Sequence, residues 1–94
     1  MFVEFPPFNA IGDHAGTTTA GTVTLTKPAG ARELMIQVLT QNARYCYGTV
    51  APSATIGFQL AAGAAPVIIK LWLGTAIQLC AESGTASIQY QWGG

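Results

Sequence analysis

The sequence predicts an all-β fold, a single small β-sandwich or jelly-roll-like barrel of about seven short antiparallel strands. From Thr17 onward, apolar and polar residues alternate with the period of two that is typical of strands with one buried face. Clusters of Gly, Pro, Asn and Ser interrupt this alternation at roughly the 8–12-residue spacing of small sandwiches. No segment shows a sustained helical period, so we expect strands joined by short turns.

Each expected strand is a run of alternating or β-branched residues that ends at a turn signal. In the second of them, alternate positions place Leu34, Ile36 and Val38 on one face and Met35, Gln37 and Leu39 on the other. The expected strands span residues 22–26, 33–40, 43–47, 56–60, 67–72, 75–81 and 85–92.

The aromatic residues of the strands allow two interpretations, a sugar-stacking platform or packing in a core or an interface. They are Tyr45, Tyr47, Trp72, Tyr90 and Trp92. Tyr90 and Trp92 share a face with Ile88, which favours the core or interface interpretation, because aromatic side chains dominate apolar contacts of both kinds.

Residues 1–16 are expected to form an extended N-terminal arm, and residues 17–94 the sandwich domain. Pro6 and Pro7 remove two backbone donors and exclude a helix here. The arm is rich in apolar side chains, so we expect it to pack either on its own core or on a neighbouring subunit. Its candidate partner-binding residues are Phe2, Phe5, Phe8 and Ile11.

The composition is unusually poor in charge. The chain of 94 residues has 9% charged and 50% hydrophobic residues and a net charge of zero, whereas an average soluble domain has about 25% charged residues. A surface of Thr, Gln, Ser, Gly and Ala loses little hydration on contact but is poorly soluble when left free. The composition therefore predicts a protein that is assembled with other protein subunits.

Other partner classes fit the sequence less well. The four basic residues are scattered and form no basic patch of the kind that nucleic-acid binding requires. No apolar run reaches the roughly 18 residues needed to span a bilayer. The first residues match no secretory signal, so we expect synthesis and folding in the cytoplasm.

No pattern of residues indicates catalysis or a cofactor. The one histidine, His14, follows Asp13 without a positioned serine or a phosphate-binding glycine loop, so we expect both side chains to face solvent. One His and two distant Cys match no zinc-ligand spacing. Cys46 and Cys80 are expected to be free and buried rather than joined in a disulfide.

Arg44 lies between two tyrosines in a segment with few charges. Such an arginine is commonly held by a carboxylate or by backbone carbonyls. We expect Glu33, Glu82 or the backbone of a neighbouring subunit to pair with it, which makes Arg44 the fifth candidate partner-binding residue; the alternative is a solvated strand residue.

Several short runs stand out between residues 17 and 92. They are Lys27-Pro28-Ala29-Gly30-Ala31, Asn42-Ala43-Arg44-Tyr45-Cys46-Tyr47-Gly48, Ala51-Pro52-Ser53-Ala54, Gly57-Phe58-Gln59-Leu60 and the closing Ala86-Ser87-Ile88-Gln89-Tyr90. Their order resembles that of small β-sandwich head decoration (cement) proteins of tailed bacteriophages. The positions that carry over are Arg44, Tyr45, Gly48, Pro52 and Gly57, for which the resemblance implies a role in the strand and loop framework.

The resemblance implies a non-enzymatic virion structural protein. Such a protein is made in the host cytoplasm, lies on the capsid exterior and stabilises the shell of the major capsid protein. It also implies a homo-oligomer, with a trimer favoured over a dimer, and no cofactor. The alternatives are a tail or connector accessory protein and a carbohydrate-binding β module of a tail fibre.

Overall fold

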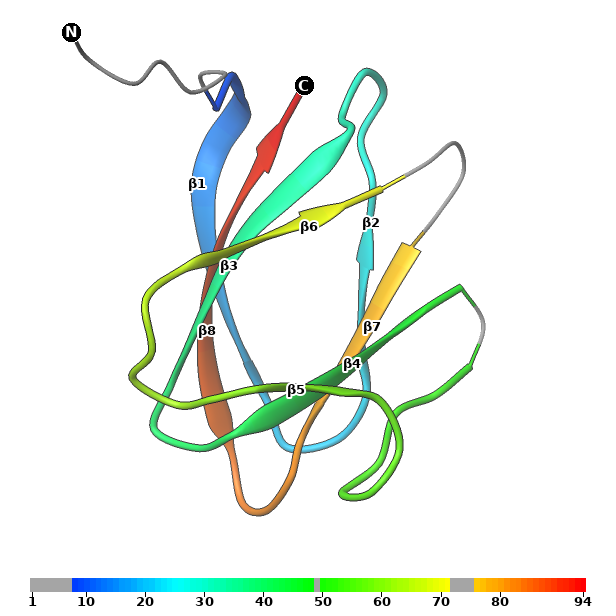
Figure 1. Cartoon of the computed structure of the whole chain (residues 1–94), viewed down its shortest axis with the longest axis vertical. Coiled ribbons are helices and arrows are strands. Elements are labelled where there is room, and N and C mark those ends of the chain that lie inside the picture. The colour runs from blue at the N-terminus through cyan, green and yellow to red at the C-terminus, as the bar shows by residue number, and fades with distance from the viewer. Residues whose placement is uncertain (1–7, 49, 72–75) are drawn as a thin grey trace, which may run out of the picture.

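The computed structural model describes residues 8–48, 50–71 and 76–94. Over these residues the chain forms eight β-strands and no helix (Figure 1). The strands are β1 (Ala10–Thr19), β2 (Val23–Thr26), β3 (Glu33–Leu39), β4 (Ala43–Tyr47), β5 (Phe58–Leu60), β6 (Val67–Lys70), β7 (Ala76–Ala81) and β8 (Ala86–Gly93). The expected all-β fold is therefore confirmed.

The strands form two four-stranded sheets in which every pair is antiparallel. The first sheet has the order β1-β8-β3-β6 and the second the order β2-β7-β4-β5. Figure 1 shows the chain crossing repeatedly from one sheet to the other. This interleaved order of eight strands is that of a jelly roll, the arrangement of two sheets from two Greek keys.

The core lies between the inner faces of the two sheets. Leu34, Ile36 and Val38 of β3 are all at most 2% exposed, so they share one face, as their spacing predicts, and the structure shows that this face is the buried one. They meet Ile77 and Leu79 of β7, which are fully buried. Alternate residues of a strand point to opposite faces, so each of these strands turns its remaining residues outward.

The aromatic residues of β8 lie at the margin of this core. Tyr90 and Trp92 are half-buried and pack against the core cluster. Their rings meet edge to face, with centroids 6.3 Å apart. This packing confirms the core interpretation for both residues, while Trp72 lies outside the described residues.

The seven expected strands correspond to β2–β8, and β1 is the strand that the pattern missed. Residues 10–16, assigned to the arm, belong to β1 and pair with β8. The alternation fails there because three residues, Gly12, Asp13 and His14, lie opposite the single Gln91 as a bulge. Gly12 adopts a φ of +73°, which is open to glycine at little cost. Residues 1–7 of the expected arm lie outside the described residues.

The depth of the core gives a stability prediction. Ile88 is fully buried, whereas Ile56 is 54% exposed. We expect Ile88→Ala to lower the free energy of unfolding by about 2–5 kcal/mol, because it removes buried methyl groups and leaves a cavity. Ile56→Ala should change it by less than about 0.5 kcal/mol. Urea unfolding of both variants measures the difference, and equal losses would contradict the assignment of the core.

Candidate protein-interaction surface

The outer face of the first sheet is broad and nearly uncharged. It carries the residues of β1, β8, β3 and β6 that alternate with the core positions, and we call it the glutamine face. Its members are Gly16, Thr18, Met35, Gln37, Leu39, Ile68, Ser87, Gln89 and Gln91. Its charged side chains lie at the margins, as the Glu33–Lys70 ion pair at 2.5 Å and Asp13 in the bulge.

Local hydrogen bonds hold the glutamines of this face. The Gln91 side-chain amide donates to the carbonyls of Ile11 and Gly12 at 3.1 and 3.0 Å, and so closes the bulge. The Gln89 side-chain carbonyl lies 2.6 Å from Nε2 of His14. His14 is exposed, as expected, but it contacts this face. Side chains already fixed in place lose little conformational entropy when a partner covers them.

A second neutral surface adjoins the glutamine face. Residues Ala61 to Ile68 are eight consecutive exposed residues without a charged side chain, and we call them the neutral segment. The backbone of this segment is anchored, since Gly63 N–H donates to the Val38 carbonyl at 2.9 Å and Ala62 N–H to Asn42 Oδ1 at 2.8 Å. Gln37 also donates to the Ala64 carbonyl at 3.1 Å. An exposed run of this length without charge makes the neutral segment a candidate contact surface.

Three aromatic rings gather where β4 runs past the end of β5. Tyr45 lies 5.8 Å from Tyr47 and 5.5 Å from Phe58, measured between ring centroids. Phe58 is 63% exposed, and the rings border an open hollow of about 420 Å³ that Val50 also lines. Partial burial, with Tyr47 beside it, raises the pKa of the Tyr45 hydroxyl.

The chemistry of this hollow fits a sugar poorly. Its lining is Tyr45, Cys46, Tyr47, Val50, Gly57 and Phe58, which includes no carboxylate and no side-chain amide. Sugar recognition needs such groups beside the aromatic face to fix the hydroxyls. The lining of the hollow is therefore mainly apolar.

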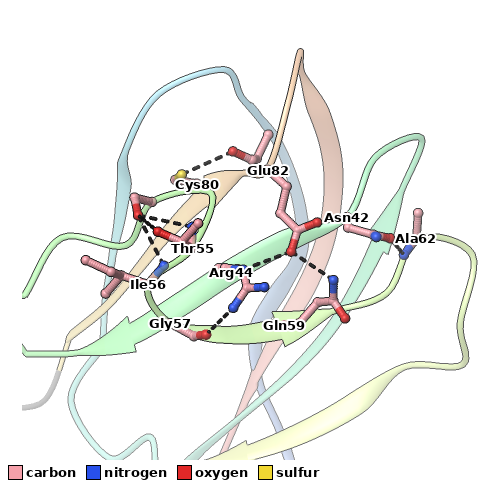
Figure 2. Close-up of polar contacts among 11 residues, drawn as sticks. Asn42, Arg44, Thr55, Ile56, Gly57, Gln59, Ala62, Cys80 and Glu82 are labelled. Carbon is pink, nitrogen blue, oxygen red and sulfur yellow. Dashed lines mark hydrogen bonds and ion pairs between the residues drawn. The ribbon is translucent and has the colours of Figure 1, made fainter.

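Arg44 is engaged within its own chain. Its Nε donates to Glu82 at 2.8 Å and its Nη1 to the Gly57 carbonyl at 2.9 Å (Figure 2). Of the expected carboxylates the partner is Glu82, while Glu33 pairs with Lys70. Gln59 also donates to Glu82 at 2.8 Å. Arg44 thereby ties β4 to the start of β5 and to the residue after β7.

The Glu82 carboxyl has a pKa below its usual value. The hydrogen bond from Gln59 lowers the pKa of Glu82 most, and the hydrogen bond and charge of Arg44 lower it further against an opposing effect of burial. Because all these donors favour the ionised form, the network is intact at neutral pH and weakens when the carboxyl is protonated.

The described arm residues pack on the C-terminus of their own chain. A Cβ at Gly93 would lie 2.6 Å from the Phe8 ring, and one at Gly94 would lie 2.5 Å from Ile11 Cδ1. The backbone N–H of Gly94 donates to the Asn9 carbonyl at 2.8 Å. Phe8 and Ile11 therefore contact their own chain. Phe2 and Phe5 lie outside the described residues.

The two thiols of the chain are not joined to each other. Cys46 and Cys80 are free, as expected, but only Cys80 is buried and Cys46 is partly exposed. In residues 8–48, 50–71 and 76–94, no three His, Cys, Asp or Glu side chains lie close enough to hold a metal ion. Within the same residues, no helix of bilayer-spanning length and hydropathy occurs.

The sequence pattern did not indicate two features of the structure. One is the neutral segment, and the other is the packing of the Phe8 ring on Gly93, which we call the glycine seat. The absence of charge from residue 61 to residue 68 was a usable signal for the first. The C-terminal Gly-Gly pair carried no signal of its own, because its contacts come from Phe8, Ile11 and Gly30, which are all more than 60 positions away.

The glycine seat can be tested with a double-mutant cycle. Gly93→Ala should destabilise the fold by about 1–3 kcal/mol, because the added methyl overpacks the Phe8 ring. In a Phe8→Ala background the same change should cost much less. Gly21→Ala is the matched control, since a Cβ there meets nothing within 4 Å. Additive losses for Phe8→Ala and Gly93→Ala would contradict the contact.

The Glu82 network predicts a pH dependence. The folded-state pKa of Glu82 lies below its unfolded value, so its stabilisation is present above pH ~4.5 and is lost as the pH falls through the folded pKa. Glu82→Gln should lower the urea midpoint at pH 7, and the difference from the unmodified protein should shrink below pH 4. Asp13→Asn, an exposed control, should leave the midpoint unchanged; a pH-independent loss for Glu82→Gln would refute the network.

Comparisons with protein-family models, with curated proteins and with solved structures found no significant match. Function must therefore be inferred from the surfaces that the fold exposes. The two surfaces on which we base this inference are the glutamine face and the neutral segment, because both are broad and nearly free of charge.

Proposed function

We propose that this protein is a non-enzymatic structural protein of a bacteriophage virion, a decoration subunit that packs on the capsid exterior and stabilises the shell of the major capsid protein. The observation that carries the proposal is the glutamine face, a four-stranded surface whose charges lie at its margins. A protein partner can cover such a face without stripping water from ions. The resemblance of residues 17–92 to head decoration proteins supports the same conclusion.

The shape and chemistry of the surface suit attachment better than reaction. A decoration subunit needs area and a low cost of dehydration, and repeated weak contacts over a symmetric shell add up through multivalency. The glutamine face supplies both, since its side chains are neutral and several are already held by hydrogen bonds. In this role the protein needs no cofactor and no reactive group.

The arm is proposed to extend this attachment. Phe8 and Ile11 are used within the chain, which leaves Phe2 and Phe5 as the candidate contacts of the arm. Arg44 is held by Glu82 and Gly57, so its proposed contribution is to fix the β4–β5 framework rather than to touch the partner.

The alternative functions differ in how well they are supported. A tail or connector accessory protein needs the same neutral surface, and particle binding distinguishes it from a decoration subunit. A carbohydrate-binding module is less well supported, because the aromatic hollow lacks carboxylate and amide side chains.

Co-sedimentation with phage particles tests the proposal. Purified full-length chain is mixed with capsids of its own phage that lack it, and with isolated tails. We expect it to pellet with capsids. Leu39→Glu, which places an unpaired carboxylate on the glutamine face, should weaken binding by roughly tenfold or more. Deleting residues 1–7 leaves β1 whole, and this deletion should also weaken binding to capsids.

Thr24→Glu is the matched control, because Thr24 is exposed on β2 of the opposite sheet. It should bind capsids as tightly as the unmodified protein does. Binding to tails alone, binding to neither particle, or equal loss for both carboxylate variants would each overturn the assignment.

A further inference from the structure

The four edge strands of the sandwich differ in how well they are protected from other chains. An unprotected edge offers backbone donors and acceptors to another strand. The β1 edge is interrupted by the bulge at Gly12–His14, and β5 has only three residues. β2 buries Leu25 and exposes only threonines. β6, by contrast, leaves Val67 and Ile68 40% and 47% exposed, and these two residues are also the last two of the neutral segment.

The register fixes which backbone groups β6 turns outward. Leu71 N–H donates to the Arg32 carbonyl at 2.8 Å, so Leu71 faces β3. Backbone groups of successive strand residues point to opposite sides, so Ile69 also faces β3, and Ile68 and Lys70 face the open edge. The Tyr47 hydroxyl donates to the Lys70 carbonyl at 3.2 Å, as expected for a carbonyl directed away from β3.

We propose that β6 pairs antiparallel with β6 of a second copy of this chain, about a twofold axis at Ile68. Ile68 presents both a donor and an acceptor at the edge, so the two copies can exchange Ile68 N–H to Ile68 carbonyl hydrogen bonds reciprocally. The two first sheets then become one eight-stranded sheet. Side chains match across the axis, since Ile68 meets Ile68 on the outer face and Val67 meets Ile69 on the inner face.

The charges of β6 favour a second copy as the occupant. Its only charged residue is Lys70, whose ammonium lies 2.5 Å from Glu33 of the same copy. In this register Lys70 faces the neutral Pro66 of the second copy, so no like charges meet. An edge without a net charge gives an unrelated charged strand nothing to complement, whereas an identical neutral edge fits it.

The proposed register is also compatible with Pro66, which has no backbone N–H to donate. Pro66 would lie opposite the Lys70 carbonyl, which the Tyr47 hydroxyl already occupies. The neutral segment is also anchored by Val38 and Asn42, so pairing orders little additional backbone. The pairing gives a twofold dimer instead of the trimer expected from the resemblance.

Sedimentation equilibrium of the purified full chain tests the pairing without any phage particle, so its outcome is separate from that of the capsid experiment. We expect a dimer. Ile68→Lys places two ammonium groups side by side at the axis and should raise the dimer Kd by roughly tenfold or more. Ile56→Lys makes the same change at a similarly exposed isoleucine off the edge, and should leave the Kd unchanged.

A second variant tests whether a weaker dimer could result from a defect in folding. Ile68→Pro removes only the outward N–H of an edge strand, which such strands tolerate, and should also weaken the dimer while circular dichroism stays that of the unmodified protein. Ile68→Cys should form a disulfide-linked dimer on mild oxidation, and Ile56→Cys should not. A monomeric or trimeric mass for the unmodified chain, or equal dimer Kd values for Ile68→Lys and Ile56→Lys, would overturn the proposal.

Discussion

The burial of aliphatic side chains between the two sheets is the interaction on which the rest of the structure depends. A chain of 94 residues buries a modest core, and here β3 and β8 supply most of one wall while β7, with single residues of β2, β4 and β5, supplies the other. Leu34, Ile88 and Ile77 are fully buried, so the register of each strand is pinned by its position in that core. A slip by one residue would move these side chains to the outer face.

Because the core fixes the register of each strand, it also fixes which residues lie on the outer faces. Of the positions that alternate with the core of the first sheet, most hold Gln, Ser, Thr or Met, and the charged pair Glu33 and Lys70 lies at the margin. Two of the few ionic groups of each sign are used in local ion pairs, Glu33 with Lys70 and Arg44 with Glu82. The remaining surface is easy to dehydrate and does little to keep copies apart, which suits a protein that acts by contact.

The two proposed contacts lie next to each other and reinforce each other. Ile68 belongs both to the glutamine face and to the free edge of β6, and Met35 lies directly across from it on β3. Pairing of two β6 strands would join two glutamine faces into one continuous surface. A dimer would then present twice the area to a symmetric shell, and its two halves would bind with an effective concentration that a monomer lacks.

The sequence by itself determined the strands β2–β8, the grouping of Leu34, Ile36 and Val38 on one face of β3 and the candidate carboxylates for Arg44, because alternation and scarce charge are local properties. Tertiary structure alone decided the rest. The bulge that hides β1 is closed by Gln91, and the seat of Phe8 is formed by Gly93. Strand order and free edges also depend on pairings between residues far apart in the chain, which no local period encodes.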